Sequence, residues 1–199
     1  MIRWRHLFFL AALTFFGVHD VWAQSYRNTI QVPPVEVYQS MLNFADRKDY
    51  AKVVGSLDTL APIVNHITAK FTDNPSDGIK KAVDKGNQDD ILLSVHTLIV
   101  LDIKDLLDEA LKQVAQSPDA SKTMVKTARL NYELLSSYVQ KKDFTADQKI
   151  KKSFTESFRL LGSDSVFSSD KAQVNSDQLK RLSGEIVSDI SKVFVLKGA

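Results

Sequence analysis

The sequence contains no cysteine. This absence excludes a disulfide framework, a thiolate metal site and the cysteine pair that attaches haem covalently. It also excludes a bacterial lipoprotein, because the lipid of that class is carried by a cysteine. A chain without such links must be held together by its core. The roughly 176 residues that follow the predicted leader are enough to bury about 70% of the surface of the unfolded chain.

Residues for familiar catalytic sites are also scarce. Beyond residue 23 the only histidines are His66 and His96, and no serine is flanked by glycines as in a nucleophile turn. Nucleophilic catalysis needs a nucleophile beside a base, so we assign no catalytic residue. The chain has seven glycines. None of them forms a glycine-rich phosphate-binding loop.

An excess of charge of one sign is missing too. The 26 basic and 24 acidic side chains give a net charge of +2, and the balance stays close to neutral when the first 23 residues are left out. A near-neutral chain gives no electrostatic argument for binding nucleic acid or an anionic membrane surface. We therefore expect no nucleic-acid partner.

The first 23 residues have the order of parts found in a secretory signal peptide. Arg3 and Arg5 precede the uncharged stretch 7–18, and the small residues Val21 and Ala23 precede the expected cleavage site. An uncleaved anchor is the alternative, but this apolar stretch is shorter than the roughly 20 residues of a membrane-spanning helix. We expect residues 1–23 to be removed, which leaves a periplasmic or secreted protein without a transmembrane anchor and without tryptophan.

Strand signals are missing, and apolar residues recur at helical spacing instead. After an irregular leader over 24–34, the pattern predicts helices separated by short polar segments. Their expected ranges are 35–48, 50–71 with a kink at Pro62, 75–85, 88–114, 118–142, 146–161 and a last helix from Ser176. The sequence therefore predicts an all-α fold over 35–199, a single helical-bundle domain of about six to seven mostly antiparallel helices.

Residues that favour helix ends support these boundaries. We expect N-caps at Asp49, Asn74, Asn87 and Ser117, a capping box of Thr145 with Gln148, and a glycine end at Gly86. The segment 91–114 is the most apolar part of the chain, and its first half is apolar nearly all round. A helix of that kind belongs in the centre of a bundle.

An acidic stripe interrupts this apolar segment. Asp102, Asp105 and Glu109 are spaced to line one edge of the helix. Binding of a hard cation, exchange of a proton and contact with a basic partner are possible functions of these carboxylates. Catalysis by Asp102 and Glu109 is a more remote possibility. We favour pairing inside the bundle with the basic face of Lys122, Lys126 and Arg129. Asp102 in particular must find a partner or lose its charge.

Metal or haem held between helices is the other chemistry that the sequence leaves open. Its candidate ligands are Met41, His66, His96 and Met124. His96 falls about 40° from the centre of the apolar face of its helix, but no second ligand follows it at three or four residues. We favour a core histidine bonded to a backbone carbonyl, a solvated His66, and methionines that fill the core. No metal ligand and no cofactor is assigned.

These observations favour a non-enzymatic helical bundle outside the cytoplasm that acts as an accessory, scaffold or binding subunit. The alternative is a metal- or haem-binding periplasmic bundle for uptake, storage or electron transfer. The expected partner is a protein or a small ligand. Val166 and Phe167, in the loop 163–174, are candidates to cap the bundle or to contact that partner. Whether Asp102 and His96 line a cavity or are satisfied core residues is left open by the sequence.

Overall fold

Helices make up nearly all of the structure. The computed structural model describes residues 27, 29–71, 74–162 and 175–194. Its helices are α2 (Pro34–Asp46), α3 (Tyr50–Thr59), α4 (Ala61–Phe71), α5 (Pro75–Lys85), α6 (Gln88–Gln113), α7 (Pro118–Lys142), α8 (Phe144–Leu160) and α9 (Ser176–Phe194). No strand occurs among these residues, which confirms the all-α prediction. The expected signal peptide, and the loop 163–174 with Val166 and Phe167, lie outside the described residues.

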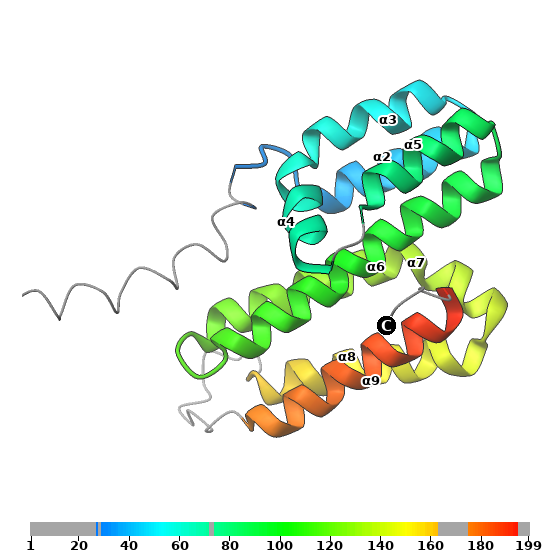
Figure 1. The fold of residues 1–199 in the computed structure, drawn as a ribbon. Coiled ribbons are helices and arrows are strands. Elements are labelled where there is room, and N and C mark those ends of the chain that lie inside the picture. The colour runs from blue at the N-terminus through cyan, green and yellow to red at the C-terminus, as the bar shows by residue number, and fades with distance from the viewer. Residues whose placement is uncertain (1–26, 28, 72–73, 163–174, 195–199) are drawn as a thin grey trace, which may run out of the picture.

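The eight described helices exceed the predicted six to seven because the expected kinked helix over 50–71 is two helices. α3 ends at Thr59, and Leu60 separates it from α4. Pro62 is the second residue of α4, where its missing N–H leaves no helical bond unmade. Its ring would clash with the preceding turn if α3 continued, so the chain changes direction instead. Figure 1 shows α4 running across the direction of α3.

The helix ends around α5 follow the prediction. The side-chain oxygen of Asn74 accepts hydrogen bonds from the backbone N–H groups of Ser76 and Asp77, 3.1 and 3.3 Å away. Asn87 caps α6 in the same way. Gly86 ends α5 with a φ of 65°, a left-handed conformation that favours glycine. These asparagine and glycine signals therefore place both ends of α5 and the start of α6.

Other predicted caps are confirmed in position only, or are wrong. Ser117 and Asp49 are the N-cap residues of α7 and α3, as predicted, but neither side chain makes a capping hydrogen bond. The capping box at Thr145 is replaced by Asp143, whose carboxylate accepts from the backbone N–H of Ala146 at 2.9 Å. Asp143 lies two residues before the predicted cap Thr145. α8 therefore begins directly after α7, with no intervening loop.

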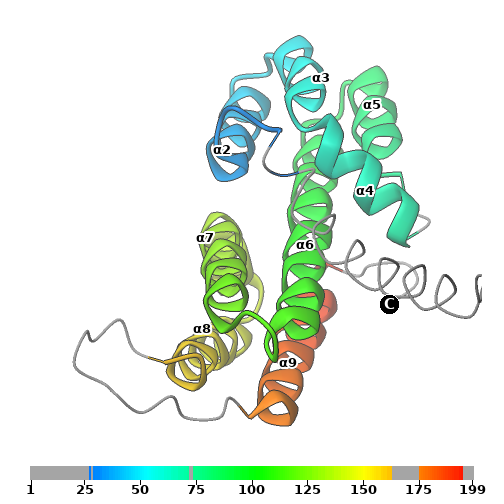
Figure 2. The ribbon, with the colours of Figure 1, turned by 90° about the vertical axis from the view of Figure 1, so that its left-hand side faces the viewer.

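The central position predicted for 91–114 is confirmed. α6 packs against α2, α4, α5, α7 and α9, and Figure 2 shows it running the length of the molecule between them. Its residues Leu98, Ile99 and Ile103 are almost fully buried. α7, α8 and α9 complete a bundle beside one half of α6 (Figure 1). α2 and α5 pack against the other half, and α3 packs against α2 and α5. Among the described residues, no helix combines the length and the apolar character that crossing a membrane requires.

Candidate functional site

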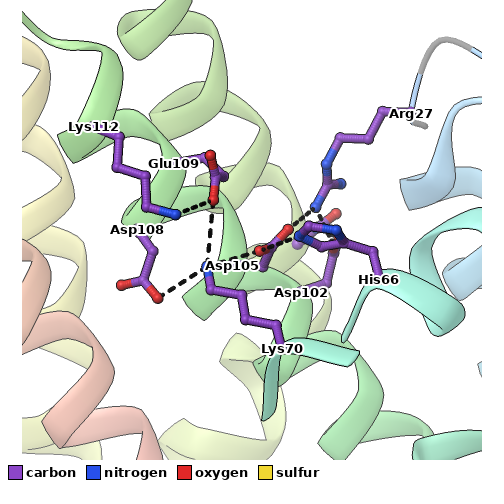
Figure 3. A network of polar contacts seen from close by, with 9 residues as sticks. Arg27, His66, Lys70, Asp102, Asp105, Asp108, Glu109 and Lys112 are labelled. Atoms are coloured by element: carbon purple, nitrogen blue, oxygen red, sulfur yellow. Dashed lines mark hydrogen bonds and ion pairs between the residues drawn. The ribbon is translucent and has the colours of Figure 1, made fainter. Parts of the chain in front are cut away.

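A buried network of charged side chains crosses the middle of the molecule. Its centre is the acidic stripe of α6, where Asp102 and Asp105 are fully buried and Glu109 nearly so. Figure 3 shows that the partners arrive from several separate segments: Arg27 from the chain before α2, His66 and Lys70 from α4, and Lys112 from α6 itself. The network therefore ties distant parts of the sequence to the central helix.

Asp102 is a satisfied core residue rather than part of a cavity wall. One of its carboxylate oxygens accepts a hydrogen bond from the guanidinium of Arg27. The other accepts from the side-chain amide of Asn131, on α7, at 2.8 Å. Pairing and hydrogen bonds of this kind offset the cost of burying a carboxylate. This geometry answers the question that the sequence left open for Asp102.

Asp105 is the most heavily bonded member. Its oxygens lie 3.1 Å from Nη2 of Arg27, 3.1 Å from Nε2 of His66 and 2.9 Å from Nζ of Lys70. Burial opposes the charge on Lys70, but the hydrogen bond and attraction from Asp105, with the attraction of Asp108, raise its pKa above the ordinary value. Lys70 is therefore a permanent cation of the network.

The stripe was expected to pair inside the bundle, and it does so with different partners from those predicted. Lys122, Lys126 and Arg129 lie instead along a groove between α7 and α8. Lys70 and Lys112 reach Glu109, at 3.5 and 2.7 Å. A helical wheel of α6 identifies the acidic edge, but it does not reveal which neighbouring helix turns a basic edge toward it.

The expectation that His66 is solvated holds only in part. Its side chain is 31% exposed and bonded to Asp105. His66 and Lys70 are four residues apart, so they share one face of α4, and this spacing was an available signal that the sequence analysis missed. Arg27 and Asn131 were missed as well, because neither stands in a recognisable motif.

Three members of the network have the atoms of a metal site. Ligand atoms of His66, Asp105 and Glu109 all lie within 4.8 Å of one another, and this is the one such group within the described residues. However, the ammonium of Lys70 lies 2.9 Å from Asp105 and 3.5 Å from Glu109. Lys70 thus supplies the positive charge that a metal ion would bring, and the group is better described as an ion-pair cluster.

His96 is buried among aromatic rings and does not belong to that cluster. Its ring centre lies 4.9 Å from that of Tyr138 on α7 and 5.6 Å from that of Phe194 on α9. Its Nδ1 is buried and has no hydrogen-bond partner, so this nitrogen does not make the predicted bond of one ring nitrogen to a backbone carbonyl. Burial lowers the pKa of His96 to about 4, although Asp46 opposes this effect. His96 is therefore a neutral core residue near pH 7.

A second buried carboxylate, which the sequence analysis overlooked, joins α7 to α8. Asp147 is fully buried and accepts hydrogen bonds from Tyr132 and Ser136, both at 2.8 Å. Lys151 lies 2.9 Å from it. Burial favours the neutral acid, but the bonds from Lys151, Tyr132 and Ser136 together hold its pKa below the ordinary value. Asp147 therefore carries a charge that stabilises the contact between these helices.

A groove lies on the surface between α7 and α8, with a volume of about 760 Å³. Basic side chains surround it, and Leu130 and Phe158 contribute its apolar part. Leu130 is 47% exposed, one of few large apolar side chains in the described chain with so much contact to solvent. The guanidinium of Arg129 lies 5.8 Å from the ring centre of Phe158. The groove thus combines positive charge with apolar surface.

Comparison with known proteins adds no further indication of function. No protein-family model matches the chain, and neither the curated proteins nor the solved structures give a match.

Proposed function

We propose that this chain is exported and acts without catalysis, as a binding or scaffold protein that holds an acidic, partly apolar segment of a protein partner in the α7–α8 groove. The observation that carries the proposal is the half-exposed Leu130 within a ring of basic side chains. A patch of exposed apolar surface rimmed by polar side chains is typical of an interaction site, and Leu130 and Phe158 together supply the apolar surface of this groove.

The charges of the groove favour an acidic partner. Lys122, Lys126, Arg129 and Arg159 contribute four positive charges, against one carboxylate, that of Glu133. Glu133 lies 3.6 Å from Arg129 and is the one carboxylate among the lining residues, so basic side chains outnumber acidic ones in the groove. Complementary charge of this kind speeds association and selects partners.

The apolar part of the groove favours a peptide over a nucleic acid. Leu130 and Phe158 offer surface to leucine or phenylalanine side chains, as in grooves that receive the apolar face of a helix. Four local cations in a chain of net charge +2 are few for binding a phosphate backbone, whose affinity comes mainly from the number of phosphates neutralised.

Peptide binding tests this assignment. We expect a short peptide that combines glutamates with leucine and phenylalanine to bind, and a peptide with lysines in place of the glutamates to bind at least about tenfold more weakly. The variant Lys126→Glu/Arg159→Glu should lose at least about tenfold in affinity for the acidic peptide. The matched control Lys80→Glu/Lys81→Glu makes the same charge change on exposed positions of α5 and should retain it.

Three outcomes contradict the proposal. They are equal binding of both peptides, equal loss in the control variant, and preferential binding of a single-stranded oligonucleotide or of phosphatidylglycerol vesicles. Leu130→Asn separates the apolar contribution from the charge, because it removes the exposed apolar side chain and leaves the net charge of the groove unchanged. That variant should lower the affinity for the acidic peptide and leave the helical circular dichroism spectrum of the protein unchanged.

Export is tested separately. The protein recovered from outside the cytoplasm of an exporting cell should begin at Gln24 and show no tryptophan fluorescence, since Trp4 and Trp22 precede that residue. An intact N-terminus in that fraction contradicts the prediction.

The metal- or haem-binding alternative has its own measurement. Metal analysis and a visible absorption spectrum of the purified protein separate the two functions. A stoichiometric metal, or a haem band that disappears in a His96→Phe variant, favours the alternative.

A further inference from the structure

A cluster of three rings holds the end of α9 against the core. Tyr138 on α7 and Phe194 on α9 are stacked, with ring centres 5.1 Å apart and an angle of 19° between the rings. His96 on α6 packs against both rings and meets Phe194 edge to face, at 69°. Three helices therefore meet at this cluster. Its one side chain that takes up a proton in the range from neutral to mildly acid pH is that of His96.

The last turn of α9, residues 191–194, depends on this cluster for its attachment. Phe194 is 4% exposed and is the one buried residue of this turn, and the preceding buried side chain of α9 is Ile190, four residues earlier. A helix end held by one side chain opens at a lower free energy than the interior of the helix. When this turn opens, the ring of His96 loses its cover on the α9 side while Ile190 keeps its place in the core.

The closed cluster offers a proton on His96 no compensation. The buried Nδ1 makes no hydrogen bond in the part of the chain that the structure describes. Burial opposes the charged imidazole and lowers the pKa of His96 to about 4. In the open form the ring is hydrated, so it accepts a proton as an ordinary histidine does.

Charged groups on the neighbouring helices do not stabilise the protonated ring in the closed form. Asp46, at the end of α2, attracts the proton, but it is exposed and water and salt screen its effect. On α7, the ammonium of Lys142 lies 5.8 Å from the ring centre of Tyr138, and its charge has the same sign as that of the imidazolium. On α9, the last charged residues of the described part, Asp189 and Lys192, pair with each other at 2.7 Å.

We infer that the last turn of α9 is an acid-sensitive latch, in which protonation of His96 favours release of Phe194 from the core while the helical bundle stays folded. Release uncovers the stacked rings of Tyr138 and Phe194. Because an exported chain meets the pH of the medium, the latch couples exposure of this aromatic surface to external acidity, and this consequence alone rests on the proposed export. The latch does not involve the α7–α8 groove, so its failure leaves the proposed binding function untouched.

The difference in proton affinity sets the size of the effect. The closed form has a pKa of about 4 at His96, and the open form has the ordinary value of 6.5. The equilibrium constant for opening therefore rises as the pH falls, by about 70-fold between pH 7.5 and pH 4.5. Below pH 4 both forms are protonated and the constant no longer changes through this group.

Amide hydrogen exchange of the full chain, resolved by NMR, measures this opening. After correction for the intrinsic pH dependence of exchange, residues 191–194 should show an opening constant about 70-fold larger at pH 4.5 than at pH 7.5. This opening should not respond to low concentrations of urea, because release of one helical turn exposes little surface. Exchange in the centre of α6 should depend on urea, because it requires unfolding of the bundle.

Two histidine variants assign the pH response. His96→Phe keeps the ring contacts and has no group that titrates, so the opening constant of residues 191–194 should change less than about twofold between the two pH values. His66→Gln is the matched control, because it removes the other histidine of the described residues, on α4, and keeps a donor for Asp105. This control should retain the 70-fold response.

Phe194→Ala tests the anchor without altering the interior of the bundle. This variant should open residues 191–194 at pH 7.5 to at least the extent that the parent shows at pH 4.5. The latch is overturned if the parent shows no pH response in this turn, if His96→Phe retains the response, or if His66→Gln loses it. It is equally overturned if exchange in this turn depends on urea as strongly as exchange in α6, since the acid effect would then be global unfolding.

Discussion

Replacing His96 by phenylalanine is expected to remove an acid-sensitive step from the stability of the fold. The imidazole is 7% exposed and packs against Tyr138 and Phe194. Phenylalanine preserves these ring contacts but has no nitrogen to protonate. The comparison therefore isolates the titration of one buried side chain.

The size of this pH effect follows from the pKa of His96 in the folded chain and in the unfolded chain. Burial lowers the pKa of His96 from 6.5 to about 4, so between these pH values the unfolded chain binds a proton that the folded chain does not. Stability is therefore complete above pH 6.5 and falls as the pH decreases toward 4. Between pH 7.5 and pH 4.5 this one group lowers the free energy of unfolding by about 2.5 kcal/mol.

Urea unfolding followed by circular dichroism measures this difference. The parent should lose about 2.5 kcal/mol more than His96→Phe on going from pH 7.5 to pH 4.5. At pH 7.5 the variant should be as stable as the parent, or slightly more so, because it removes the unpartnered Nδ1. If both proteins lose the same free energy over this interval, His96 is not held neutral in the fold and the reasoning is wrong.

Three further expectations concern the buried carboxylates and the glycines. Asp105→Ala leaves buried cations without their partner and should lower the free energy of unfolding by about 3 kcal/mol in urea melts at pH 7. Tyr132→Phe should cost about 1 kcal/mol and raise the pKa of Asp147. Because the lowered pKa of Asp147 contributes stability that is lost as the pH falls below about 4, the variant should unfold at a higher pH in an acid titration. Gly86→Ala should cost about 1 kcal/mol because of its positive φ, whereas Gly55→Ala, in a helix interior, should gain up to about 1 kcal/mol. The thermal midpoints of these two variants should therefore move in opposite directions.

The sequence predicted the helices well where the signal was local. The caps at Asn74 and Asn87 depend on a side chain and the next few backbone groups, so they can be recognised without knowledge of the tertiary structure. The Pro62 signal was equally local. It indicated an interruption, but the choice between a kink and a break depends on how α4 packs against α6, which periodicity does not specify.

The partners of the buried charges were not predictable in the same way. Asp102 could be identified as a carboxylate in need of a partner, yet Arg27 lies 75 residues away in the sequence. The basic face of α7 was the most visible candidate in the sequence, and it faces a groove instead. A helical wheel gives the direction of a side chain on its own helix but not the rotation of its neighbour.

The orientation of α4 illustrates what the buried network adds to apolar packing. This short helix buries only Ile63, Val64 and Ile67, and three aliphatic side chains can be accommodated in more than one rotation about the helix axis. The bonds from His66 and Lys70 to Asp105 are directional, and a rotated α4 would leave a buried carboxylate without these partners, which costs several kcal/mol. Replacing an entire buried ion-pair set by apolar residues is often neutral or stabilising for the free energy of unfolding. The expected consequence of doing so here is therefore a loss of defined position for α4 rather than a loss of stability. In such a variant we expect an unchanged urea midpoint, together with amide exchange that is faster in α4 than in α6. This result would show that the network positions α4, and it would distinguish that role from a purely energetic one.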